Sequence, residues 1–142
     1  MQLDIETLET TFDLVAPRGQ ELMDIFYARL FTAAPAVTPL FANTDLKRQK
    51  AMLLSTLVLL RKSLRKLDAI LPTLHQLGAR HVAYGAKPEH YPVVGRVLIV
   101  SLAEVAGEAW RVEHELAWAA AFEVIAHAML TGAAEAELAA AA

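Results

Sequence analysis

Apolar positions recur every three to four residues along most of this chain. In residues 4–15, for example, Leu8, Phe12 and Val15 fall on one face, and Pro17 follows the last of them. This spacing predicts an amphipathic helix, because 3.6 residues complete one helical turn. The same spacing predicts further helices over residues 19–32, 46–66, 70–82, 91–106 and 112–131.

Prolines, glycines and capping residues divide these segments. Pro35 and Pro39 leave room only for a short helical turn before Phe41, while Asp45 can cap the long helix that follows and Gly107 can end a later one. The chain shows no convincing period-two strand pattern and no Asn-Gly hairpin. We therefore expect an all-α protein with about seven helices. Their unequal lengths favour helices that cross obliquely around a pocket over a symmetric bundle.

Length and composition fit one domain over residues 1–142 with a sizeable core. Hydrophobic residues make up 56% of the chain, and many are alanine. That excess allows either tight helix packing or an apolar pocket that a cofactor fills. Residues 133–142 form an alanine-rich tail that has little to pack against, so we expect it to fray.

Charge and cysteine content narrow the function classes. A net charge of −3 gives no reason to expect nucleic acid or anionic lipid as the main partner. The absence of cysteine excludes disulfides, zinc–thiolate sites, iron–sulfur clusters and covalently attached haem. The acidic residues 1–6 do not resemble a secretory signal, and the apolar run 70–74 is too short to span a bilayer. We expect a soluble, cytoplasmic protein without a membrane span.

Two residues are candidates for holding a flat, metal-containing cofactor. His81 lies in the segment Ala79–Ala83 of this largely apolar chain, and burial there favours the neutral imidazole that binds metals. Phe41 follows two prolines that fix the local backbone, which would set its ring rigidly against a planar group. The alternative is that both side chains are ordinary core residues.

A second pair of residues, Tyr27 and Gln49, could bind a small ligand. Tyr27 lies in an apolar stripe, where a buried hydroxyl needs a hydrogen-bond partner, although the side chain could instead reach the surface. Gln49 heads the stripe that Leu53 and Leu57 continue, so its amide would face whatever these leucines cover. A solvated glutamine in the first helical turn is the alternative.

Short sequence pieces in a characteristic order carry a family resemblance. They are Phe26–Phe31, Pro35–Phe41, Gln49 with Leu53, Leu71–Leu74, Leu77–His81, Tyr84–Gly85, His90–Gly95, and Trp118 with Phe122. Through them, residues 4–131 resemble the bacterial single-domain haemoglobins and the globin domain of flavohaemoglobins. The resemblance implies a globin fold and a non-covalently held haem b.

The resemblance also implies residue roles. It implies His81 as the iron ligand, Phe41 against the porphyrin, and Tyr27 and Gln49 as donors toward the gas ligand. Leu53 would form an apolar wall over that ligand. Leu57 would share in keeping water out of the same pocket.

On the histidine side of the haem, the chain departs from the family pattern. The resemblance places Tyr91 near His81 together with a glutamate late in the last helix. Ala133 stands where that glutamate is expected, and the nearest carboxylates are Glu135 and Glu137.

A tyrosine and an amide beside ferrous haem suit dioxygen, which becomes partly negative when it binds. Charge-assisted hydrogen bonds to it are worth about 1.5–3 kcal/mol each. Carbon monoxide would gain less. We therefore expect reversible, high-affinity oxygen binding for transport or storage, with carbon monoxide and nitric oxide as further ligands.

Three other functions remain open. The first is nitric oxide dioxygenase or peroxidase-type detoxification at the same site. It would need a separate reductase, because the chain stops where the flavin module of flavohaemoglobins would begin. The second is a sensor, for which no output domain is present. The third is a cofactor-free helical protein in which every candidate residue belongs to the core.

Overall fold

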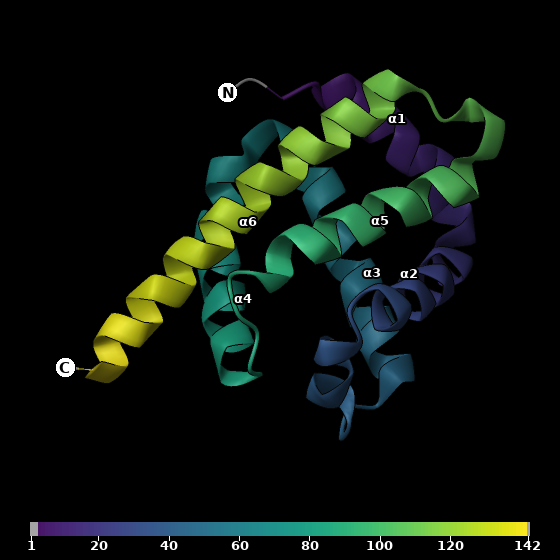
Figure 1. The fold of residues 1–142 in the computed structure, drawn as a ribbon. Helices are drawn as coiled ribbons and strands as arrows, with labels where there is room; N and C mark the ends of the chain where they lie inside the picture. Colours follow the sequence, from purple (N-terminus) through teal and green to yellow (C-terminus); the bar gives the residue numbers. More distant parts are fainter. Residues whose placement is uncertain (1–2, 142) are drawn as a thin grey trace.

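A computed structural model describes residues 3–141, and these fold into an all-α structure (Figure 1). Short 3-10 segments, among them Pro35–Phe41 and Leu64–Ile70, join some of the α-helices. The α-helices are α1 (Ile5–Val15), α2 (Gly19–Ala33), α3 (Leu46–Ser63), α4 (Leu71–Ala83), α5 (His90–Ala106) and α6 (Val112–Ala141).

Two of the predicted helix boundaries are confirmed, and each has a clear physical cause. The Asp45 carboxylate accepts a hydrogen bond from the Arg48 backbone N–H at 3.3 Å and so caps α3. Gly107 follows α5 with a φ of 61°, a left-handed conformation that costs glycine little.

Two other boundaries differ from the prediction. The helix expected over 46–66 stops at Ser63, and Lys66 (φ −143°, ψ 50°) breaks the helical path. The break allows Leu64 and Ile70 both to be buried. The last helix runs on past residue 131 to Ala141, in keeping with the high helix propensity of alanine. Fraying of residues 133–142 stays a prediction, and residue 142 lies outside the described part.

Helix α6 is in contact with several of the other helices. It runs beside α4 and also packs against α1 and α5, while α2 packs against α3 and α5 (Figure 1). By length and composition alone, α6 is long and apolar enough to cross a membrane. In this fold α6 packs against three other helices, α1, α4 and α5. The expectation that no segment spans a membrane stays a prediction.

Candidate functional site

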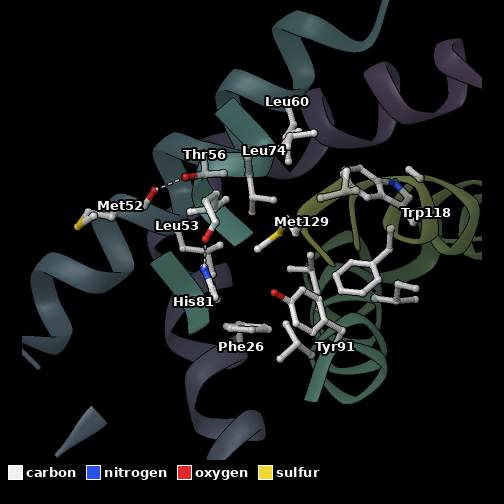
Figure 2. Close-up of a pocket in the computed structure, with 18 of the residues that line it drawn as sticks. Phe26, Met52, Leu53, Thr56, Leu60, Leu74, His81, Tyr91, Trp118 and Met129 are labelled. Carbon is white, nitrogen blue, oxygen red and sulfur yellow. Dashed lines mark hydrogen bonds between the residues drawn. The ribbon is translucent and has the colours of Figure 1, made fainter. Parts of the chain in front are cut away.

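A cavity of about 310 Å³ lies between the helices, and its wall is mainly apolar. Helices α1 to α6 all contribute to the wall, part of which is drawn in Figure 2. Its lining includes Phe26, Gln49, Leu53, Leu57, Leu74, Leu77, His81, Tyr91, Val94, Leu98, Phe122, Ile125 and Met129. Of the seven candidate site residues, the structure brings Gln49, Leu53, Leu57, His81 and Tyr91 to this one cavity.

His81 enters the cavity from the last turn of α4. Its Nδ1 lies 2.7 Å from the Leu77 carbonyl oxygen, one turn earlier on the same helix (Figure 2). Because a carbonyl can only accept, Nδ1 carries the proton and Nε2 keeps its lone pair. Burial lowers the pKa of His81, more than the bond to Leu77 raises it. The ring is thus a neutral imidazole with one nitrogen free to bind a metal.

Tyr91, in the first turn of α5, lies beside His81. The two ring centroids are 6.5 Å apart, and the tyrosine hydroxyl points into the cavity (Figure 2). Burial raises the pKa of Tyr91, so the hydroxyl keeps its proton at neutral pH. Within residues 3–141, Nδ1 of His81 pairs with Leu77 and not with Tyr91. A hydrogen bond from Tyr91 close to the iron ligand therefore stays a prediction.

Gln49 and Tyr27 form a polar pair among apolar side chains. Gln49, in the first turn of α3, donates from Nε2 to the Tyr27 hydroxyl oxygen at 3.2 Å. Tyr27 lies on α2 and is only 3% exposed, and burial raises its pKa. Gln49 lines the cavity, whereas Tyr27 lies behind the wall and reaches it through this bond. Because the tyrosine oxygen accepts from Gln49, its own O–H stays free to donate.

Phe41 belongs to the aromatic cluster behind Tyr27. Its ring centroid lies 5.9 Å from that of Tyr27 and 5.4 Å from that of Phe31, both in edge-on contacts. The aromatic side chain of α2 that reaches the cavity wall is Phe26, which packs edge-on against Tyr27 at 4.9 Å. The structure therefore brings Phe41 together with Tyr27. Contact of Phe41 with a porphyrin stays a prediction.

Several wall residues were missed by sequence reasoning. Helical periodicity does mark their faces as buried, but a face that lines a cavity and a face that fills a core have the same apolar pattern. Only the arrangement of the helices distinguishes them. The missed wall residues include Phe26, Leu74, Leu77, Val94, Leu98 and Met129.

Within residues 3–141, no carboxylate lines the cavity that His81 enters. Ala133, at the position where the resemblance expects a glutamate, is buried. Glu135 and Glu137 are both exposed on α6, and within residues 3–141 neither is hydrogen-bonded to His81. The imidazole is therefore oriented by a neutral backbone carbonyl.

The donor set fits a haem group. A single neutral imidazole offers one nitrogen to a metal, and the mainly apolar side chains of the wall can cover a flat ring. A metal ion bound by protein ligands alone is not indicated. Within residues 3–141 there is no cluster of three or more His, Asp or Glu side chains that could hold one.

The fold and the site together define a class: an all-α protein in which one histidine faces an apolar, cofactor-sized cavity. The family model for globins matches residues 24–129, and this chain belongs to the globin family. Family membership implies haem binding and the binding of small gas ligands.

Curated relatives point to the bacterial branch of that family. The chain is 31% identical over 128 residues to a flavohemoprotein of Bacillus subtilis (strain 168), covering 89% of this chain but 32% of that protein. It is 35% identical over 129 residues to a flavohemoprotein of Bacillus thuringiensis subsp. konkukian, with the same coverage. The chain thus spans about a third of the length of the curated relatives that it matches. It resembles their globin part.

Solved structures share the fold. An engineered carbene transferase from Rhodothermus marinus superposes with a TM-score of 0.83 at 23% identity, covering 99% of this chain and 100% of that one. A bacterial globin from Campylobacter jejuni superposes with a TM-score of 0.78 at 24% identity, covering 92% and 94%. The all-α globin fold predicted from the sequence is confirmed.

Proposed function

We propose that this globin binds haem b non-covalently and binds dioxygen reversibly and with high affinity. Bound haem would supply an iron able to bind a small gas molecule, and His81 would hold that iron in the cavity. One observation carries the proposal. The neutral imidazole of His81 on α4 lines an apolar cavity, and Gln49 on α3, which is hydrogen-bonded to Tyr27 on α2, lines the same cavity.

His81 is the proposed iron ligand. Its Nε2 is unprotonated because the Leu77 carbonyl holds the proton on Nδ1. That hydrogen bond also fixes the tautomer and the ring orientation, as it does for metal-binding histidines in general.

Tyr27 and Gln49 are the proposed donors to the gas molecule. Gln49 donates to the tyrosine oxygen, which leaves the Tyr27 O–H directed elsewhere, and Gln49 itself lines the cavity. A hydrogen bond to a partly charged acceptor contributes about 1.5–3 kcal/mol. Because about 1.4 kcal/mol corresponds to a factor of ten, one such bond would slow dioxygen release roughly tenfold or more. Carbon monoxide, a poorer acceptor, would gain less.

Leucines of α3 exclude water from the part of the cavity beside Gln49. Leu57 is 6% exposed, and Leu53 lies one turn earlier on the cavity wall. Exclusion of water strengthens the donor–acceptor interactions, because the local dielectric constant falls. It also protects the ferrous state that reversible binding requires.

Detoxification of nitric oxide is the second candidate. The observation that favours it is the match to flavohemoproteins, which covers about a third of each of those proteins. Turnover by this globin would need electrons from a separate reductase. Nitrate formation from nitric oxide and oxygen, measured with an added flavin reductase and compared with the reductase alone, would support this function over simple binding.

Optical spectroscopy tests the proposal. Purified protein reconstituted with haem b should show an intense absorption band near the blue edge of the visible. It should also give distinct ferric, deoxygenated and oxygenated spectra that interconvert when oxygen is removed and returned. A chain that binds no haem, or whose ferrous form oxidises without a reversible oxygenated spectrum, would contradict the proposal.

A further inference from the structure

Helices α4 and α6 are in close backbone contact at two glycines, Gly78 and Gly132. A methyl group added at Gly78 of α4 would overlap the backbone carbonyl of Met129 on α6. A methyl group added at Gly132 of α6 would overlap the backbone of His75 on α4. Both glycines are buried. The two helices are therefore in backbone-to-backbone contact, which only residues without a side chain permit.

This crossing lies one turn from His81 and on the same helix. Helix α4 supplies Leu74, Leu77 and His81 to the cavity wall, and Met129 of α6, whose carbonyl meets Gly78, lines the same cavity (Figure 2). Any shift of α4 relative to α6 thus moves the histidine relative to the cavity.

The way His81 is held makes it depend on that crossing. Its Nδ1 pairs with Leu77, which belongs to the same helix, so the ring follows α4 as a rigid part of it. The side chain at position 133 of α6 is an alanine, which cannot hold the ring from outside the helix. Within residues 3–141, the position of the imidazole therefore depends on the position of the α4 backbone.

We propose that Gly78 and Gly132 are positioning residues for the iron ligand. By fixing α4 directly on the α6 backbone, they set the distance and tilt at which Nε2 of His81 meets the haem iron. The inference rests on the proposed haem function. It goes further by assigning control of the iron–imidazole bond to two residues that touch neither the haem nor the gas molecule.

The test compares three Gly-to-Ala variants of the haem-loaded protein. In Gly78→Ala and Gly132→Ala the new methyl group meets backbone, which cannot rotate away, so α4 must move. Gly19→Ala is the matched control, because there the methyl group meets only the end of the flexible Leu54 side chain. The readouts are the iron–imidazole stretching frequency of the ferrous form and the ferric/ferrous reduction potential. Both should shift in the two crossing variants and stay at the wild-type value in Gly19→Ala.

A second comparison shows whether the glycines act through His81. In a His81→Gly background, free imidazole can take the place of the side chain without being tied to α4. Adding Gly132→Ala should then leave the stretching frequency unchanged. A shift that persists in this background would overturn the positioning role and assign the effect to the cavity as a whole.

The outcomes separate the two proposals. If the wild type binds no haem, or binds it without His81, the proposed function fails. If His81 binds the iron but neither crossing variant shifts either readout, only the positioning role fails. If alanine prevents folding, nuclear Overhauser contacts between the Gly78 and Met129 α-protons are measured in the haem-loaded wild type. Their absence would overturn the inference.

Discussion

The two sides of the cavity are built differently. On the α4 side, the functional ring is held by its own helix, through Leu77, and that helix lies on the α6 backbone. On the α2–α3 side, the polar pair Tyr27–Gln49 comes from two helices and is backed by aromatic side chains. The first arrangement depends on backbone packing and the second on side-chain hydrogen bonding. Substitutions on the two sides of the cavity should therefore change different properties of the protein.

The largest effect is expected on the α4 side. His81→Ala removes the proposed iron ligand, so haem retention should fall sharply, or the retained haem should be rescued by added imidazole. Haem content and the iron–imidazole band measure this. Alanine variants of the other histidines, His75, His90, His114 and His127, should retain haem. Unchanged haem content and an unchanged band in His81→Ala would refute the assignment.

The next largest effect is expected behind the polar pair. Phe41→Ala removes a half-buried ring that packs on Tyr27 and Phe31, which should cost about 3 kcal/mol of unfolding free energy. Urea denaturation of the haem-free and haem-loaded forms measures it. A larger loss with haem would support porphyrin contact, whereas equal losses would show a purely structural role.

Tyr27→Phe isolates the hydroxyl, because the shape of the side chain is nearly kept. Loss of the donor should accelerate oxygen dissociation roughly tenfold or more, with a much smaller effect on carbon monoxide. Stopped-flow release of both gases from the ferrous protein measures it. An unchanged oxygen off-rate would mean that Tyr27 only serves as an acceptor for Gln49 and does not reach the gas molecule.

The pH dependence of stability should report on His81. Burial lowers its pKa in the folded haem-free protein, so the unfolded chain binds the proton more readily. The stability that neutral His81 contributes is therefore fully present above the pKa of the unfolded chain, near 6.5. As the pH falls below that pKa, the free energy of unfolding decreases by at most about 1.4 kcal/mol per pH unit. Urea denaturation of the haem-free protein between pH 5 and 7.5 should show this slope in the wild type and a shallower one in His81→Gln.

The smallest effect is expected for Gln49→Leu. It should speed oxygen release in the same direction as Tyr27→Phe but less, because Gln49 is half-buried at the first turn of α3. The two effects should not add, since both side chains serve one ligand and are bonded to each other. Stopped-flow measurements on the double variant complete the cycle. Strict additivity would show that the pair does not act as a unit.

The helical segments, the cap at Asp45 and the stop at Gly107 were open to prediction, because they depend on neighbours along the chain. His81, Gln49 and Leu53 could be proposed for the same reason, with the family resemblance assigning their roles. The early end of α3 at Ser63 could not be foreseen, since burial of both Leu64 and Ile70 outweighs the helical pattern that runs to residue 66.

Contacts between distant segments were decided by the tertiary structure. The Tyr27–Gln49 bond joins residues 22 positions apart, and its geometry depends on how α2 and α3 cross. The contact of Gly78 with Met129 is equally hidden, because a glycine in a helical pattern signals a close neighbour without naming it. Local propensity and periodicity determine which segments are helical and which faces are apolar. Only the packing of those faces decides which side chains meet around the cavity.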